Sequence, residues 1–310
     1  MRGAHVTLFF VFITFLSAYI TLVPVPSVFS NNDFEKAYFA SSDWIDLVGE
    51  RTRIGNFDLY SVGTISSISE SSIVYIWGDS HAEQYFPRVT YLLKRNERIS
   101  ATFIRQRGCP PIMSLQHDNE IINYRYRECD AVLADLFKQT TFPAKSKALV
   151  ASFCWACLLI PSNINQGLTE PEEPFFIING ERVNLFSEQG RNQFFSGFIE
   201  MFLRLGESSG QLYVFLGNPV GEHFNPLNQG HLGHKRVAVG SEQVELNNFL
   251  YKSLSDNDRI EVVNLLGELC DEMNMCLREH LSGSPIYKDS DHLNASFIRD
   301  YASWLDQVFL

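Results

Sequence analysis

Basic residues are scarce in this 310-residue chain. It has 25 Lys and Arg against 36 Asp and Glu, which gives a formal net charge of −11. A surface that binds nucleic acid needs a basic patch or stripe to neutralise the phosphates, and the sequence contains no long run of Lys or Arg. The composition therefore argues against nucleic acid as a partner.

Internal repeats and hairpins are also missing from the pattern. No segment recurs along the chain, and no two neighbouring apolar segments form a convincing hairpin pair. Instead, apolar segments of strand length alternate with amphipathic segments through five rounds. This alternation is typical of a mainly parallel sheet with helices on both faces, an α/β fold. A hydrophobic content of 45%, with 25 Phe, is enough for a full core.

The expected elements follow from these periods of hydrophobicity. Five strands are expected at residues 72–77, 98–104, 148–155, 212–216 and 260–266, with smaller ones at 175–178 and 285–288. Helices are expected at residues 82–95, 129–140, 187–209, 242–254 and 294–309.

The one long apolar run lies at the N-terminus, where Arg2 precedes residues 6–23. Its eighteen residues fall between the core of a signal peptide and a membrane span. Residues 28–30 would permit signal cleavage, but the length favours an uncleaved anchor. Either interpretation puts the rest of the chain outside the cytoplasmic membrane. The predicted division is an anchor or signal segment over residues 1–30, a tether and lead-in over 31–70, and one domain over 71–310.

Six cysteines are consistent with export, because disulfides persist in oxidising compartments. Cys109 and Cys129 bracket a loop, and Cys270 and Cys276 lie on either side of a turn-forming stretch. Each pair could close a local disulfide.

The remaining pair, Cys154 and Cys157, has CxxC spacing inside an apolar predicted strand rather than at a helix start. We interpret it as two buried thiols rather than a redox motif. A four-cysteine zinc site is disfavoured because the cysteine pairs lack ribbon-like spacing. His223, His231 and His234 share a loop with no acid or cysteine at supporting spacing. We therefore predict neither a metal nor a cofactor.

A polar motif, Gly78-Asp79-Ser80-His81, follows the first strand and precedes a helical segment. Open α/β folds bind ligands at the carboxyl ends of their strands. A backbone N–H near a helix N-terminus can also stabilise a developing anion. Ser80 is thus a candidate nucleophile, and the alternative is an ordinary helix N-cap.

A second polar cluster, residues 288–294, precedes the last helix. A serine nucleophile needs a base within hydrogen-bond reach and an acid on the far nitrogen of that base. Asp289 and His292 are three residues apart on a loop, so the carboxylate can fold back onto the ring. The other ring nitrogen is then free to face Ser80. Such a set could transfer an acyl group through a serine ester.

Several motifs recur in a fixed order from about residue 70 to the C-terminus. They are Gly78-Asp79-Ser80-His81, Cys109-Pro110-Pro111, the strand with Trp155, Leu216-Gly217-Asn218-Pro219, the Cys270/Cys276 pair and Tyr287-x-Asp289-x-x-His292-Leu293. This ordered set resembles the SGNH (GDSL-like) hydrolase superfamily. The likeness is closest to the SGNH domains fused behind membrane O-acyltransferases that modify bacterial surface polysaccharides. The resemblance implies a flavodoxin-like, three-layer α/β/α fold around a mainly parallel, five-stranded sheet.

The resemblance also implies roles for individual residues. Ser80 would be the nucleophile, His292 the base and Asp289 its orienting acid. Oxyanion donors would be the Ser80 N–H and Gly108. The superfamily asparagine after the third strand has no match here, and Trp155 stands near that position as an expected pocket residue.

The implied activity is transfer of an O-acyl group, with acetyl the expected group, to an envelope polysaccharide through a Ser80 acyl-enzyme. Expected partners are an acyl donor, a carbohydrate acceptor and an integral-membrane acyltransferase, because the fused relatives carry a multi-span membrane part. The expected location is the outward, periplasmic face of the cell envelope. Two alternatives are a stand-alone carbohydrate O-acetylesterase and a non-catalytic carbohydrate-binding module of the same fold.

Overall fold

The structure is a computed structural model. It describes residues 31–54, 57–63, 72–106, 109–138, 146–160, 173–207, 209–228 and 234–310. The predicted anchor over residues 1–30, Gly108 and His231 lie outside these ranges. Among the described helices, none has the length and apolarity needed to cross a membrane.

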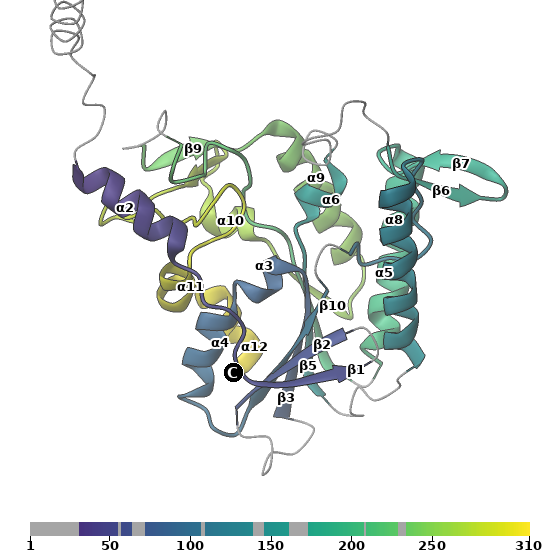
Figure 1. The fold of residues 1–310 in the computed structure, drawn as a ribbon, viewed down its shortest axis with the longest axis horizontal. Coiled ribbons are helices and arrows are strands. Elements are labelled where there is room, and N and C mark those ends of the chain that lie inside the picture. Colours follow the sequence, from purple (N-terminus) through teal and green to yellow (C-terminus); the bar gives the residue numbers. More distant parts are fainter. Residues whose placement is uncertain are drawn as a thin grey trace, which may run out of the picture.

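A seven-stranded sheet runs through the molecule in the order β1-β2-β4-β3-β5-β8-β10 (Figure 1). The last five strands of this order are parallel to one another. They correspond to the five predicted strands, which confirms the mainly parallel α/β fold. Their bounds are β3 (Ile73–Gly78), β4 (Ser100–Arg105), β5 (Ser146–Ser152), β8 (Ser209–Phe215) and β10 (Ile260–Val263).

The two further strands come from residues that the sequence analysis assigned to a tether. β1 (Glu50–Ile54) and β2 (Phe57–Val62) pair as an antiparallel hairpin, and β2 pairs antiparallel with β4. The sheet therefore has seven strands rather than five. The sequence of β1, Glu-Arg-Thr-Arg-Ile, is mostly charged, as edge strands often are. Such a strand lacks the apolar run by which the other five were predicted.

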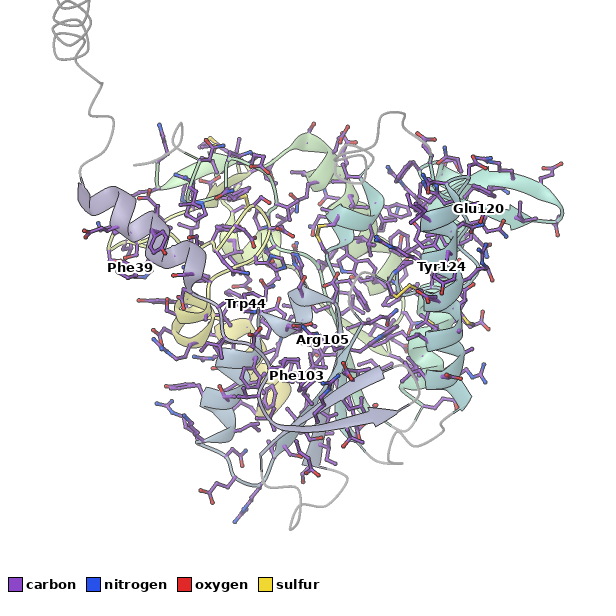
Figure 2. All side chains as sticks on the ribbon, viewed as in Figure 1. Phe39, Trp44, Phe103, Arg105, Glu120 and Tyr124 are labelled. Carbon is purple, nitrogen blue, oxygen red and sulfur yellow. A yellow bond between two sulfur atoms is a disulfide. The ribbon has the colours of Figure 1, made fainter. Side chains whose placement is uncertain are left out.

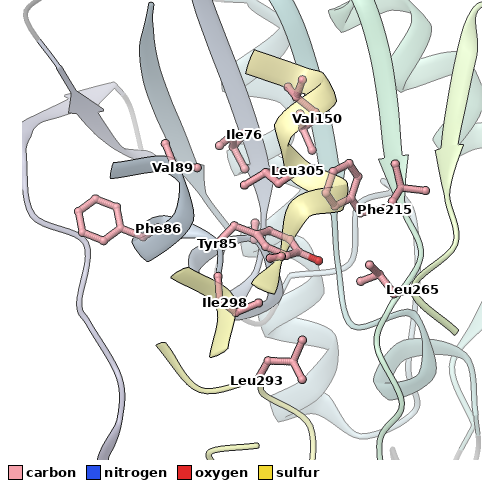
Figure 3. Close-up of a cluster of buried hydrophobic side chains, with 14 of the residues drawn as sticks. Ile76, Tyr85, Phe86, Val89, Val150, Phe215, Leu265, Leu293, Ile298 and Leu305 are labelled. Atoms are coloured by element: carbon pink, nitrogen blue, oxygen red, sulfur yellow. The ribbon is translucent and has the colours of Figure 1, made fainter. Parts of the chain in front are cut away.

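Helices cover both faces of the sheet and complete the three layers (Figure 1). Successive strand residues such as Ile76 and Trp77 point to opposite faces of the sheet, and they belong to two separate apolar clusters. The Trp77 side packs against α5 (Glu120–Lys138), α8 (Glu188–Leu205) and α9 (Ser241–Ser255). The Ile76 side, drawn in Figure 3, packs against α4 (Phe86–Leu93), α11 (Ala295–Tyr301) and α12 (Asp306–Phe309).

Apart from α2, the remaining elements are short. Two small antiparallel sheets form, β6 with β7 and β9 with β11. Of these four strands, only β6 was predicted. The predicted strand at 285–288 is reduced to isolated bridges at Pro285 and Tyr287. The bounds are α2 (Asn31–Ser42), α3 (Ser80–Glu83), α6 (Trp155–Leu159), β6 (Phe175–Ile178), β7 (Glu181–Asn184), β9 (Arg236–Ala238), α10 (Leu265–Leu269), β11 (Met275–Leu277) and η4 (Ser303–Leu305).

All six cysteines form disulfides. Cys109–Cys129 and Cys270–Cys276 are joined as predicted. Cys154 and Cys157 are also joined, so their interpretation as free thiols is wrong. The reason is local: β5 ends at Ser152, and Cys154 is the N-cap of α6, so the CxxC motif stands at a helix start after all.

Gly78 allows β3 to turn into α3. A side chain here would strike the Ser152 carbonyl oxygen and lie 2.7 Å from the Ala82 Cβ. We expect Gly78→Ala to lower the free energy of unfolding by about 3 kcal/mol, because the rigid neighbours cannot give way. Denaturant unfolding measures this. The control is Gly240→Ala, whose new Cβ meets nothing within 4 Å and should cost less than about 1 kcal/mol. Equal costs for the two variants would contradict the close-packed turn.

Candidate active site

The turn after β3 is built around the Asp79 carboxylate. Asp79 is the N-cap of α3, and its Oδ1 accepts a hydrogen bond from the His81 N–H at 2.8 Å. Its Oδ2 accepts from the Cys154 N–H at 2.9 Å, which ties the turn to the end of β5. Asp79 is thus engaged with backbone amides on both sides, as a structural residue of the turn. Ser80 is the first residue of α3 and stands at the carboxyl edge of the sheet.

The structure brings Ser80, Asp289 and His292 together from 212 positions apart in the chain. His292 Nε2 lies 2.7 Å from Ser80 Oγ. His292 Nδ1 lies 3.0 Å from both carboxylate oxygens of Asp289. Asp289 Oδ1 also accepts from the His292 N–H at 2.8 Å, so the carboxylate folds back as the spacing predicts. In the neutral ring, this network favours a proton on Nδ1 and leaves Nε2 to accept from the serine.

Two carboxylates surround the His292 ring. Burial alone would lower the pKa of His292. Hydrogen bonds with Asp289 and Asp291, together with their charges, outweigh burial and raise this pKa to about 9. Lys288 Nζ lies 3.8 Å from Asp289 Oδ2, near the surface of the site.

Asp291 and His81 form a second contact set that the sequence analysis did not identify. Asp291 Oδ1 lies 3.4 Å from His292 Nδ1, and Asp291 Oδ2 lies 3.5 Å from His81 Nε2. The His81 and His292 rings are 4.9 Å apart between centroids. Burial alone would raise the pKa of Asp291, but the close contacts with His292 and His81 and the charges of these rings hold it well below its usual range. The signal in the sequence was the second acid of Asp289-x-Asp291-His292.

Buried amides hold the loops of the site against each other. Gln84 Oε1 accepts from the Leu293 N–H at 3.0 Å, and Gln84 Nε2 donates to Asn218 Oδ1 at 3.1 Å. Asn218 Nδ2 donates to the Asp291 carbonyl at 2.8 Å. Gln243 donates to the Asn218 carbonyl. The predicted motif at the end of the fourth strand contains Asn218, but its partners are far away in sequence.

The N-terminal segment reaches the same site. Trp44, labelled in Figure 2, follows α2. Its ring meets the His292 ring edge-on at 5.3 Å between centroids. Lys288 Nζ lies 4.4 Å from the centre of the Trp44 ring. Asp43 Oδ2 accepts from the Ser296 N–H at 2.9 Å, which fixes this segment to the start of α11.

Of the two expected oxyanion or pocket residues, only Trp155 is described. Its side chain is 1% exposed, and its indole N–H donates to the Phe215 carbonyl at 3.0 Å. The ring packs edge-on against Phe153 and Phe198 in the core. The indole donor is therefore satisfied within the core. Gly108 lies outside the described residues.

Close groups of possible metal ligands occur twice among the described residues. One consists of Asp289, Asp291 and His292, and it coincides with the candidate triad. The other consists of His81, Cys154, Cys157 and Asp291. In the second group the two sulfurs are bonded to each other.

Comparison with protein families identifies the domain that carries this site. The family model described as "SGNH domain (fused to AT3 domains)" matches residues 51–306. The chain belongs to this family. The match begins in β1, so the β1–β2 hairpin is part of the SGNH domain here.

One solved structure supports the fold. The periplasmic domain of a lipopolysaccharide acetyltransferase from Salmonella ser. Paratyphi A is similar with a TM-score of 0.52 and 12% identity, over 76% of this chain and 83% of that one. A proposed platelet activating factor of Streptococcus pneumonia is similar with a TM-score of 0.42 and 15% identity, over 79% of this chain and 86% of that one. The search of curated proteins found no match.

The family assignment and the arrangement of side chains lead to the same class of chemistry. In this SGNH domain a serine hydroxyl lies within hydrogen-bond distance of an imidazole whose other nitrogen meets a carboxylate. Such a domain is an enzyme of the acyl-transfer or esterase kind.

The pKa of His292 provides a direct test of this environment. We expect its imidazole to titrate near pH 9 in NMR spectra of ring-labelled protein, and Asp291→Asn to lower the midpoint. The folded-state pKa lies above the ordinary value of 6.5. The charged ring therefore stabilises the fold fully below pH 6.5, and this stabilisation is lost as the pH rises through about 9. A wild-type midpoint at or below 6.5 would show that the carboxylates do not act on the ring as described.

Proposed function

We propose that this SGNH domain transfers an O-acyl group, with acetyl the expected group, to an envelope polysaccharide through an ester on Ser80. The observation that supports this most directly is the continuous contact from Ser80 Oγ to His292 Nε2 and from His292 Nδ1 to Asp289. A serine hydroxyl is a weak nucleophile unless an adjacent base takes its proton.

The first half-reaction follows from these contacts. Ser80 Oγ attacks the carbonyl carbon of the acyl donor while His292 Nε2 takes the serine proton. The Asp289 carboxylate stabilises the imidazolium that forms. As the tetrahedral intermediate collapses, the bond to the donor's leaving group breaks and His292 protonates that group. The acyl group is then an ester of Ser80.

The second half-reaction runs the same steps with an acceptor. His292 Nε2 takes a proton from a sugar hydroxyl, the sugar oxygen attacks the ester carbonyl, and the proton returns to Ser80 Oγ. The products are the acylated sugar and the free serine. The Ser80 N–H and Gly108 are proposed to stabilise the oxyanion in both halves.

The partner and location are inferred from the family. Its members are described as fused to AT3 domains, which supports an integral-membrane acyltransferase domain as the source of the acyl group. The similar Salmonella structure is the periplasmic domain of a lipopolysaccharide acetyltransferase, which supports a periplasmic position and a surface carbohydrate as acceptor. We propose that residues 1–30 anchor or export the domain.

A stand-alone carbohydrate O-acetylesterase is the second candidate. Water replaces the sugar hydroxyl in its second half-reaction. The side chain of Asp289 is 35% exposed, so solvent reaches the edge of the site. This exposure favours hydrolysis whenever no acceptor is bound.

Removal of the nucleophile tests the enzyme. We expect Ser80→Ala to lower the rate of p-nitrophenyl acetate hydrolysis about 10³-fold or more, because the acyl-enzyme cannot form. The matched control is Ser303→Ala, an exposed serine in η4, which should keep the wild-type rate. A wild-type protein that neither turns over this ester nor takes a serine-directed phosphonate would instead be a non-catalytic module. Hydrolysis that survives Ser80→Ala would contradict the choice of nucleophile.

Transfer and hydrolysis predict opposite effects in the cell. We expect a chromosomal Ser80→Ala change to reduce the O-acetyl content of the surface polysaccharide, measured by NMR of the purified polymer. A rise in O-acetyl content would show that the domain removes these groups and would favour the esterase. The Ser303→Ala strain should match the parent.

A further inference from the structure

The second group of possible ligands adjoins the catalytic histidine but takes no part in the proposed reaction. It contains one ligand atom each from His81, Cys154, Cys157 and Asp291, and these atoms all lie within 4.8 Å of one another. Cys157 Sγ is 3.9 Å from Asp291 Oδ2, and His81 Nε2 is 3.5 Å from the same oxygen. Three separate parts of the chain therefore converge on one small volume.

His81 is buried without a hydrogen bond to either ring nitrogen. Its side chain is 1% exposed, and neither Nδ1 nor Nε2 has a hydrogen-bond partner. A buried imidazole without such a partner is costly, and native structures usually satisfy such groups. Nε2 meets Asp291 Oδ2 at 3.5 Å without an aligned hydrogen bond, and a metal ion bound between them would give both atoms a direct partner.

The surrounding contacts are those that support metal ligands. The Cys157 N–H lies 3.2 Å from Cys154 Sγ, where it can donate to a thiolate as well as to a disulfide sulfur. Ser290 Oγ donates to Asp291 Oδ1 at 3.3 Å, which leaves Oδ2 facing the group. Asn218 holds the Asp291 carbonyl at 2.8 Å. Such outer contacts orient ligands and tune their charge.

The ligand set is suited to zinc. Two thiolates, an imidazole and a carboxylate are typical zinc ligands, and Zn–S and Zn–N bonds of about 2.3 and 2.0 Å set tetrahedral ligand separations of about 3.3–3.8 Å. The ligand atoms lie within 4.8 Å of one another, so those that are too far apart need to approach by about 1.5 Å at most. The two bonded sulfurs need instead to separate to about 3.8 Å. The disulfide alone prevents it, because bonded sulfurs are not thiolates.

We propose that reduction of the Cys154–Cys157 disulfide opens a zinc site formed by Cys154, Cys157, His81 and Asp291. A dithiol reductant supplies two electrons and two protons, breaks the S–S bond and becomes a cyclic disulfide. Zinc then binds the two sulfurs with release of two thiol protons, and binds the neutral imidazole and the carboxylate without proton release. The oxidised protein has only His81 and Asp291 to offer.

Zinc at this position would alter the catalytic histidine. It would occupy Asp291 Oδ2, while Asp291 Oδ1 lies 3.4 Å from His292 Nδ1. A divalent cation there opposes the positive charge that His292 acquires during acyl transfer. The reduced, zinc-loaded enzyme should therefore be slower, and this consequence alone depends on the proposed function.

Zinc content tests the site without reference to activity. The full chain carrying Ser80→Ala is reduced with a dithiol, incubated with zinc, and passed through a desalting column in oxygen-free buffer. We expect one zinc per chain in the reduced protein and none above background in the oxidised protein. Cobalt in place of zinc should give a thiolate-to-cobalt charge-transfer band and the strong visible bands of a tetrahedral site.

Two paired variants identify the ligands. Cys154→Ser with Cys157→Ser should abolish the bound zinc, whereas Cys270→Ser with Cys276→Ser, which removes a disulfide outside the group, should retain it. His81→Asn should weaken zinc binding at least tenfold in a competition titration with a chelating dye. Circular dichroism on each sample checks that it is folded.

The following results would overturn the proposal. They are no zinc in the reduced protein, equal zinc in the oxidised protein, retention of zinc after loss of Cys154 and Cys157, or zinc bound only by protein that has lost its native spectrum. Ester hydrolysis by the oxidised wild type is measured separately. Failure of the zinc site and failure of the proposed activity are thus distinguishable.

Discussion

The side-chain amide of Gln84 joins the two parts of the chain that carry the candidate triad. Gln84 follows α3, four residues after Ser80, and it binds both the Leu293 N–H and the Asn218 side chain. The serine and histidine must stay within hydrogen-bond distance although 212 positions separate them. A buried amide that is satisfied on both its oxygen and its nitrogen fixes one arrangement and penalises others. Leu293 adjoins His292, so the geometry at Ser80 depends on this bridge.

The charges around His292 follow from the same convergence. Asp289 is held by backbone N–H groups of its own loop, whereas Asp291 lies between the two histidines. Both carboxylates favour the imidazolium, so the histidine readily accepts a proton but releases it less easily. An acyl-transfer enzyme needs both steps in each half-reaction. The proximity of Asp291 to His81 and to the Cys154–Cys157 disulfide provides a physical route by which this balance can be altered.

The sequence predicted those features that depend on short stretches of chain. Strands such as β3 are continuous apolar runs, and Ser80, Asp289 and His292 lie in local motifs whose roles the family resemblance suggested. Strand β1 was missed because an exposed edge strand rich in charge has no apolar run. The CxxC motif was assigned to a strand because the apolar run continues past Ser152, where β5 ends. A shift of only two residues puts Cys154 at the N-cap of α6 instead. The Gln84–Asn218 bridge involves no local pattern at all, since each amide is meaningful only when folding brings it to its partner.

The attachment of Asp43 to the start of α11 has a consequence for how the domain is positioned. The segment between α2 and the sheet is fixed beside the loop that carries His292, with Trp44 against the ring of this histidine. Trp44 and Ser80 therefore lie on one side of the molecule, on either side of His292. In the proposed reaction the acyl group is received on this side, and the twelve residues of α2 lead to it. This helix and the fixed segment after it would then set the direction from which a preceding segment meets the site.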